Sequence, residues 1–349
     1  MLRFRPVRRS RRVQSKTTLG EYLDEWLKSY AKSNVSAKTF ERYEELIRLS
    51  IKPKVGQITL AKLQPIQVQS LYTELLESGR KKPSKTSKSA GLSAQTVLHV
   101  HRLLHEALRH AVRWQILIRN PCDAVDPPRP EQREIRTLNE AESAWLLEAA
   151  EPTRFYPGML IGISTGLRRG EVLALRWKDV NLAAGRLTVS QAMEKTNDGI
   201  RFKQPKTKRS RRTIPVPPFA IRGLTEFEKK QQQEKLLYGP DYDDHDLICA
   251  QPDGSPIDPD VYSSDVIVFL KKIGLRGVSF HKLRHSHATQ LLAQNVHPKI
   301  VQERLGHSSI AITLDLYSHV MQGLQGEAVA KLDSLISREI AKQKQQARN

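Results

Sequence analysis

Residues 281–320 contain four side chains whose types and spacing suit chemistry on a phosphodiester. They are two histidines, an arginine and a tyrosine: His281, Arg284, His307 and Tyr317. The guanidinium offers a planar fork of donors that matches two phosphate oxygens, and it stays charged at any working pH. Histidine can hold or pass a proton near neutrality, and a tyrosine hydroxyl can attack phosphorus when a base or positive surroundings activate it. The set predicts attack by a tyrosine on a phosphodiester.

The sequence around these residues resembles a known family. H-K-L-R-H-S-H-A-T at 281–289, L-G-H at 305–307 and Y-S-H at 317–319 are similar, in order and spacing, to the C-terminal signature of the tyrosine recombinases, or phage integrase family. TGLRRGEVLALRWKDV at 165–180 resembles the same family's first-arginine box. The resemblance implies a site-specific DNA recombinase, an integrase of a phage or mobile element. It would cleave and rejoin strands through a 3′-phosphotyrosyl intermediate without metal, cofactor or ATP.

The resemblance also implies a role for each matched residue. Arg168 and Arg284 would stabilise the charge that grows on the phosphoryl oxygens, with His307 donating a hydrogen bond. His281 would accept the phenol proton or share the phosphate contacts. Tyr317 would be the nucleophile that becomes joined to the 3′ phosphate.

Two supporting positions come from the same resemblance. The family places its catalytic lysine in a β-hairpin at K-T, which is Lys206 here, and this lysine would protonate the departing 5′ oxygen. Lys208 competes for that role, because both lysines can reach a phosphate and spacing does not decide between them. Glu171 would lie about one turn after Arg168 and orient its guanidinium through a buried ion pair. Without the resemblance, Arg168 and Arg169 would equally suit a solvated helix start.

The composition favours a nucleic-acid partner. The 349 residues carry a formal net charge of +20, and the sequence pI is about 10.0. A phosphate backbone attracts such an excess through Coulomb steering and counterion release. Cys122 and Cys249 are isolated, which argues against a disulfide framework and fits a reduced setting. We expect double-stranded DNA as the partner and the bacterial cytoplasm, at the nucleoid, as the location. No apolar run is long enough to span a membrane.

Three basic stretches are expected to contact the DNA backbone. The arm 1–16 is Arg-rich and free of acids, and we prefer a DNA-binding arm to an organellar transit peptide because Pro6 interrupts any early helix. The segment 79–90 reads as a mobile loop rich in Lys and Ser, and a third basic run surrounds Lys206. The expected contact residues are Arg8, Arg9, Arg11, Arg12, Lys85, Lys88, Arg169, Lys208, Arg209, Arg211 and Arg212.

The first half of the chain predicts an all-helical domain. Apolar residues recur at helical spacing after start signals at Thr18, Ser36, Pro65 and Ser93. These helices form a unit over 17–120, which the resemblance identifies as the SAM-like core-binding domain that clamps the duplex.

The second half predicts a mixed α+β catalytic domain over 137–349, after a proline-rich linker at 121–136. The fold class is therefore mainly α with a small β-sheet. A capping box is expected at Thr137 and Glu140, and a helix runs from there to about Ala150. The remaining elements are strands near 186–191 and 211–216, and helices at 223–238, 261–273 and after Tyr317.

Two histidine or acidic clusters invite a metal interpretation. His101 and His105 lie one turn apart in the sequence HRLLH, which has neither the HExxH pattern nor an evident third ligand. The stretch PDYDDHD at 240–246 lacks the glycine and terminal glutamate of an EF-hand loop. Ordinary histidines and an exposed acidic loop are the better interpretations. GxxxxGK[ST], GxGxxG, GxSxG and HExxH are absent from the sequence, which argues against ATPases, Rossmann enzymes, common hydrolases and zincins.

A recombinase of this family would work as a homotetramer on two duplexes, since each protomer cuts one strand. An accessory DNA-bending or directionality factor is a further expected partner. The C-terminal helix could dock on its own domain or on a neighbouring protomer. About sixteen residues precede the first helix, too few for a folded arm-binding domain. The alternatives are a type IB topoisomerase, which shares the Tyr-Arg-His-Lys chemistry, and a non-catalytic DNA-binding regulator.

Overall fold

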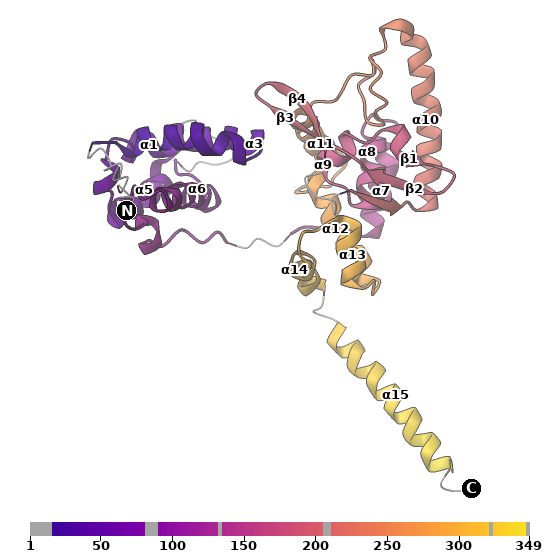
Figure 1. Cartoon of the computed structure of the whole chain (residues 1–349). Coiled ribbons are helices and arrows are strands. Elements are labelled where there is room, and N and C mark those ends of the chain that lie inside the picture. Colours follow the sequence, from indigo (N-terminus) through magenta and orange to yellow (C-terminus); the bar gives the residue numbers. More distant parts are fainter. Residues whose placement is uncertain (1–15, 81–89, 132–134, 205–210, 321–323, 347–349) are drawn as a thin grey trace, which may run out of the picture. The chain divides into compact units, whose positions relative to one another are not determined.

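The computed structural model describes residues 16–80, 90–131, 135–204, 211–320 and 324–346. The side chains of 316–320, 324–328, 331 and 344 also lie outside the description. The chain divides into two compact units, Met1–Arg133 and Glu134–Asn349, each described by itself below (Figure 1). The predicted contact or catalytic residues outside the described part are Arg8, Arg9, Arg11, Arg12, Lys85, Lys88, Lys206, Lys208 and Arg209.

The first unit is helical in its described residues. Its α-helices are α1 (Leu19–Trp26), α2 (Lys32–Asn34), α3 (Ala37–Leu46), α4 (Lys52–Val55), α5 (Pro65–Ser78) and α6 (Ala94–Arg113). Turns of π-helix at Leu27–Ala31 and Ile47–Ile51 join α1 to α2 and α3 to α4 without a break, and 3-10 turns lie at Leu60–Lys62 and Pro121–Ala124.

Local capping chemistry starts these helices where the sequence predicts. Thr18 and Glu21 form a reciprocal capping box, and the side chains of Ser36 and Ser93 accept hydrogen bonds from backbone N–H groups three residues on. Pro65 occupies the first turn of α5, where its missing N–H costs nothing. The four predicted helix starts are confirmed.

The core of the first unit is built from large side chains of α1, α5 and α6. Trp26, Tyr72 and Leu104 are fully buried. The 3-10 turn Pro121–Ala124 also packs here, because Cys122 is buried among the same side chains. The first residues of the predicted linker 121–136 are thus part of the first unit's packing.

The second unit contains most of the helices. They are α7 (Glu140–Ala150), α8 (Tyr156–Thr165), α9 (Arg169–Leu173), α10 (Pro218–Tyr238), α11 (Pro259–Lys272), α12 (Phe280–Ala293), α13 (Pro298–Leu305), α14 (Ile310–Val320) and α15 (Leu324–Gln346), with 3-10 turns at Trp177–Asp179 and Gly239–Asp241. The capping box that starts α7 is formed by Asn139 and Glu142, so its prediction at Thr137 and Glu140 is wrong. The Asn139 amide can cap as well as a hydroxyl can, and Arg136 also binds Glu142.

Two small antiparallel sheets accompany these helices. β1 (Val180–Asn181), β2 (Arg186–Val189) and β5 (Arg212–Pro215) form one sheet in the order β1-β2-β5. β3 (Ala192–Thr196) and β4 (Gly199–Lys203) form a separate hairpin inserted between β2 and β5 (Figure 1). The strands predicted near 186–191 and 211–216 are confirmed as β2 and β5. A β-hairpin was expected at Lys206, which lies outside the described residues, whereas the inserted hairpin β3–β4 ends at Lys203 and was not predicted.

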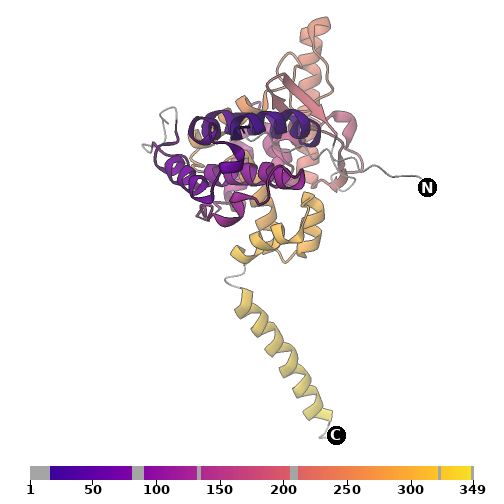
Figure 2. The same ribbon diagram turned by 60° about the vertical axis from the view of Figure 1, so that its left-hand side comes forward.

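Helix α8 lies at the centre of the second unit, and all its residues from Pro157 to Thr165 are buried. It packs closely on α12, because a Cβ added at Gly162 would meet the ring of Phe280 at 3.1 Å. Helices α12, α13 and α14 pack on one another and lie together in both views (Figures 1 and 2). This group brings the C-terminal signature residues next to the turn that follows α8.

Exposed apolar side chains line α15, at Val329, Leu332, Leu335, Ile336 and Ile340. Among the described helices, none is both long and apolar enough to cross a membrane.

Candidate active site

Arg168 is placed by a tight turn between α8 and α9. Gly166 ends α8 with φ at 68°, and a Cβ there would lie 2.5 Å from the side chain of Leu305, so glycine is required on both counts. Arg168 is the N-cap of α9 and its side chain is 44% exposed. Its guanidinium donates to Glu171 Oε1 at 3.0 Å and to the carbonyl of Gly306 at 3.1 Å.

Arg284 lies on α12 and is only 3% exposed. Its two terminal nitrogens donate to the carbonyls of Gly166 and Leu305, at 2.7 and 2.8 Å. Burial, together with the positive charge of Arg168, lowers the pKa of Arg284. The group stays charged at neutral pH because a guanidinium does not lose its proton in proteins.

Three histidines of α12 surround Arg284. His281 and His285 meet edge to face, with ring centroids 4.9 Å apart. Partial burial and the charges of Arg284 and Arg168 lower the pKa of His281, and burial lowers the pKa of His285 to about 4. His287 Nδ1 lies 2.9 Å from the carbonyl of Ile163, while its Nε2 accepts from Arg304 at 2.9 Å. These contacts hold His287 as the neutral Nδ1–H tautomer, since a carbonyl can only accept.

His307 follows the end of α13. Gly306 provides the turn with φ at 68°, and His307 Nδ1 lies 2.9 Å from the hydroxyl of the fully buried Thr313. Burial, with the charges of Arg284 and Arg168, lowers the pKa of His307 to about 4. The ring is therefore neutral at neutral pH. Thr313 is on α14, four residues before Tyr317; the side chain of Tyr317 lies outside the described residues.

Glu171 and Arg212 form an ion pair behind Arg168, with both side chains 8% exposed. Arg212 donates to the two carboxylate oxygens at 3.2 and 2.9 Å, and its Nε donates to the carbonyl of Arg304 at 2.9 Å. Glu171 thus contacts Arg168 as expected, but it also has a second arginine partner. Arg212 was expected on the DNA backbone; in the structure its guanidinium pairs with the buried Glu171 and donates to the carbonyl of Arg304.

The other described basic residues differ in their surroundings. Arg169 donates to the carbonyl of Pro259 and to Ser263, and it pairs with Asp260 at 3.5 Å, so it connects α9 to α11. Such contacts favour a structural role over the expected DNA contact. Arg211 is exposed.

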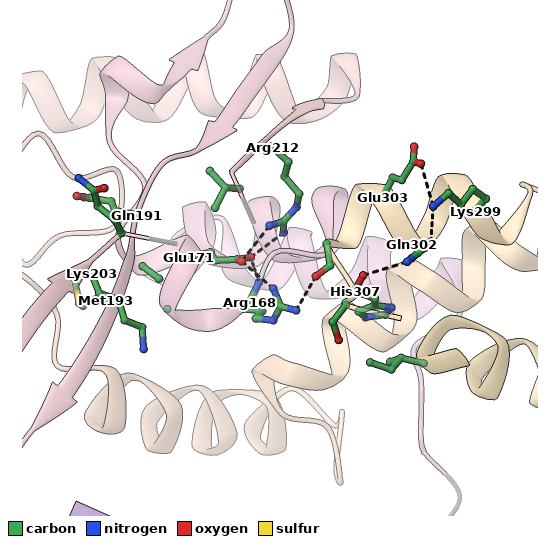
Figure 3. Close-up of a pocket in the computed structure, with 17 residues that line it drawn as sticks. Arg168, Glu171, Gln191, Met193, Lys203, Arg212, Lys299, Gln302, Glu303 and His307 are labelled. Atoms are coloured by element: carbon green, nitrogen blue, oxygen red, sulfur yellow. Dashed lines mark hydrogen bonds and ion pairs between the residues drawn. The ribbon is translucent and has the colours of Figure 1, made fainter. Parts of the chain in front are cut away.

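A cleft of about 1010 Å³ opens beside these residues (Figure 3). Arg168, Glu171, Arg212 and His307 line it, together with residues of β2, β3 and α13. Its lining residues also include Lys203, Gln204 and Lys299. Gln204 directly precedes the segment 205–210, which holds Lys206 and Lys208 and lies outside the described residues. Arg284 does not line the cleft. It donates to the carbonyl of Leu305, the residue next to Gly306, which does line the cleft.

The described residues of the two clusters that invited a metal interpretation have ordinary partners. His101 Nδ1 lies 2.8 Å from the hydroxyl of Tyr72, and His105 Nε2 lies 2.9 Å from Asp123. In the loop 240–246, Asp244 pairs with Lys235 at 2.7 Å. Over the described ranges, no group of three His, Cys, Asp or Glu side chains could hold a metal ion.

Three contributors to the site were not singled out in the sequence. Thr313 bonds His307, His287 lies behind Arg284, and Arg304 joins His287 to the carbonyls of Ser164 and Pro215. His287 lies inside the motif at 281–289 and Arg304 directly before the motif at 305–307, but nothing in their spacing distinguishes a buried connector from an exposed side chain.

Comparisons with known proteins agree with this geometry. Residues 131–323 match the Phage integrase family, and residues 18–76 match the Phage integrase N-terminal SAM-like domain. A relative named "Tyrosine recombinase XerC-like", from Caldanaerobacter subterraneus subsp. tengcongensis, is 30% identical over 337 residues, covering 91% of this chain and 83% of the relative.

Solved structures share the fold. The Tn1549 transposon integrase, in complex with a circular intermediate DNA, superposes with a TM-score of 0.76 at 20% identity, covering 90% of this chain and 99% of the other. A lambda integrase tetramer bound to a Holliday junction superposes with a TM-score of 0.61 at 20% identity, covering 88% of this chain and 82% of the other.

Proposed function

The chain belongs to the phage integrase family, the site-specific DNA recombinases that cleave and rejoin strands, and we infer that Tyr317 is its nucleophile. The predicted family and its fold class, mainly α with small sheets, are confirmed by the comparisons. Arg168, Arg284 and His307 would bind the scissile phosphate. Membership fixes the reaction class; the proposed roles of Arg168, Arg284 and His307 draw on the geometry of the site, and those of Tyr317 and the lysine on the sequence motifs.

The observation that carries the assignment is the meeting of two guanidiniums and a neutral imidazole at the end of α13. Arg168 and Arg284 both donate to carbonyls of that end, and His307 follows directly after it. Donors fixed in this way need no reorganisation when negative charge grows on the non-bridging oxygens. When the Thr313 hydroxyl donates to Nδ1 of His307, the single hydrogen of the neutral ring is on Nε2. This Nε2–H would donate to the phosphate.

The cleavage step forms one bond and breaks another. The phenol oxygen of Tyr317 attacks phosphorus and forms the 3′-phosphotyrosyl bond, while the bond from phosphorus to the 5′ oxygen breaks. His281 would take the phenol proton or share the phosphate contacts, and Lys206 or Lys208 would protonate the leaving oxygen. The aryl ester keeps the energy of the phosphodiester, so a 5′ hydroxyl of another strand can displace Tyr317 without ATP.

DNA binding and assembly follow from the same proposal. The net charge of +20 favours a duplex partner, and the first unit would contact the DNA as a core-binding domain. A tetramer would join two duplexes, by analogy with the lambda integrase tetramer on its Holliday junction. An accessory bending or directionality factor and a location at the bacterial nucleoid remain parts of the proposal. The exposed apolar residues of α15 could dock on the same domain or on another protomer.

The SAM-like match over 18–76 favours recombination over relaxation by a type IB topoisomerase. A non-catalytic regulator is disfavoured because every matched catalytic position holds the residue that the chemistry needs.

A suicide-substrate trap tests the assignment of Tyr317. Wild type and Tyr317→Phe are incubated with nicked DNA carrying the attachment site, and denaturing gels report covalent adducts. We expect an adduct with wild type and none with Tyr317→Phe, at equal DNA binding in a mobility-shift assay. Equal adducts in both proteins would move the nucleophile to another residue.

A further inference from the structure

The end of helix α13 receives three arginines from three different elements. The carbonyls of Arg304, Leu305 and Gly306 are consecutive, and they accept from Arg212 of β5, Arg284 of α12 and Arg168 at the start of α9. The last carbonyls of a helix lack partners within the helix and carry the negative end of its dipole, so cations stabilise them. This arrangement fixes the three guanidiniums relative to one another and to His307, the next residue along the chain.

Arg212 differs from Arg168 in what its donors face. Its side chain is 8% exposed, and all three of its nitrogens bond protein oxygens, two of them on Glu171 and one on the carbonyl of Arg304. Arg168 shares Oε1 of the same carboxylate but is 44% exposed at the edge of the cleft. Figure 3 shows Glu171 between the two guanidiniums.

The charge of Glu171 is what makes the second arginine matter. Burial opposes ionisation of this carboxyl, but the hydrogen bonds and charge of Arg212, with help from Arg168, outweigh it and lower the pKa of Glu171. A buried carboxylate with one cationic partner draws that partner into a bidentate pair. Without Arg212, the remaining partner is Arg168, and the donors that Arg168 would offer to a phosphate would turn toward Glu171.

We propose that Arg212 is a positioning residue for strand cleavage, which neutralises Glu171 and holds the α13 end so that Arg168 keeps its outward donors for the scissile phosphate. This inference rests on the proposed function. It separates Arg212 from Arg209 and Arg211 of the same run, whose expected partners are DNA phosphates. Arg212 is also the first residue of β5, so it ties the strand that follows segment 205–210 to the catalytic arginines.

A double-mutant cycle tests the proposal through cleavage of the suicide substrate at saturating DNA, with DNA affinity measured separately. The variants are Arg212→Met, Glu171→Gln and the double variant, with Arg222→Met on α10 as the control for loss of an arginine. We expect Arg212→Met to cut about 10²-fold more slowly, the loss that a displacement near 1 Å can cause, with DNA affinity changed less than about threefold. Adding Glu171→Gln removes the charge that misdirects Arg168, and we expect at least about tenfold recovery.

Arg212→Lys keeps the test decisive if Arg212→Met fails to fold, as judged by circular dichroism. A lysine can pair with Glu171 but cannot reach the Arg304 carbonyl at the same time, so Arg212→Lys should cut more slowly than wild type, by less than about 10²-fold. In that event the double variant, which has no unpaired buried charge, should cut within about tenfold of wild type.

Different outcomes would overturn this inference and the proposed function on which it rests. If Arg212 instead contacts a phosphate, Arg212→Met should weaken DNA binding, and Glu171→Gln should not restore the cleavage rate. That result would overturn the inference, provided that wild type still forms its adduct. An additive cycle in the cleavage rate would overturn it too. Absence of an adduct with wild type would instead overturn the proposed function, and the positioning role with it.

Discussion

Helices α6 and α12 are both rich in histidine, yet their histidines have different neighbours. On α6, His101 contacts a phenol, His105 a carboxylate and His110 the indole of Trp26, at 2.8, 2.9 and 2.9 Å. On α12, His281 and His287 stand beside arginines. Burial is the largest cause of the lowered pKa of both His110 and His287. The arginines beside the α6 histidines are exposed and lie on α6 itself, whereas those beside the α12 histidines include the buried Arg284 and arginines from other elements.

The largest expected effect comes from removing a cation of the α12 neighbourhood. Arg168→Gln should lower the cleavage rate at saturating DNA about 10²–10³-fold, the loss found when one fixed donor to a developing oxyanion is removed. Arg102→Gln is the matched change on α6, where the arginine stands beside His101, and it should leave that rate unchanged. Single-turnover cleavage measures both. Equal losses of cleavage rate in the two variants would contradict the proposal that the cations near α12, and not those near α6, take part in cleavage.

The sequence could indicate candidate reacting residues because their identity is local information. Caps at Thr18, Ser36 and Ser93 depend on side chains that bond their own next turn, so the helix starts could be predicted as well. The resemblance placed a β-hairpin at Lys206, and the hairpin β3–β4 before it was missed, although Asp198-Gly199, a dipeptide typical of hairpins, lies where its turn meets β4. Its strands are largely half-buried or exposed, so they lack the apolar alternation that marked β2.

The role of Arg212 could not be predicted for a different reason. Arg212 ends the run KTKRSRR at 206–212, in which the sequence does not show which arginine is buried and which contacts DNA. Burial against Glu171 and the α13 end depends on contacts 41 and 92 residues away in the chain. Thr313 and Arg304 were missed likewise, because a hydroxyl or guanidinium that serves a neighbour from another element leaves no spacing pattern.

The next effect concerns pH and His287. The folded chain protonates this histidine only near pH 4, whereas the unfolded chain does so near its ordinary value of about 6.5. Between those values the unfolded state holds more protons, so stability falls as the pH is lowered. His287→Gln keeps a donor and an acceptor but cannot titrate. It should reduce the slope of the free energy of unfolding by up to about 1.4 kcal/mol per pH unit, measured by urea unfolding. An unchanged slope would contradict the neutral tautomer.

A smaller effect, on stability alone, is expected on α6. His110→Phe removes the acceptor of the buried Trp26 indole N–H, which should cost about 1–3 kcal/mol of unfolding free energy. Cleavage by the folded protein at saturating DNA should stay at the wild-type rate. Urea unfolding and the suicide-substrate assay measure the two quantities. A protein of full stability with impaired cleavage would place His110 in the catalytic machinery and break the comparison.

The smallest expected effect is that of a chelator, and it applies to both helices. In the cleft, fixed guanidiniums and a neutral histidine supply the charge relief that a metal ion gives other phosphodiester enzymes. On α6, ring nitrogens of His101 and His105 are already hydrogen-bonded to Tyr72 and Asp123. EDTA should therefore change neither the cleavage rate nor the melting temperature, and added zinc should not raise the latter. Loss of cleavage in EDTA that magnesium restores would contradict the catalytic assignment, whereas a zinc-dependent rise in melting temperature that His101→Gln abolishes would make α6 a metal site.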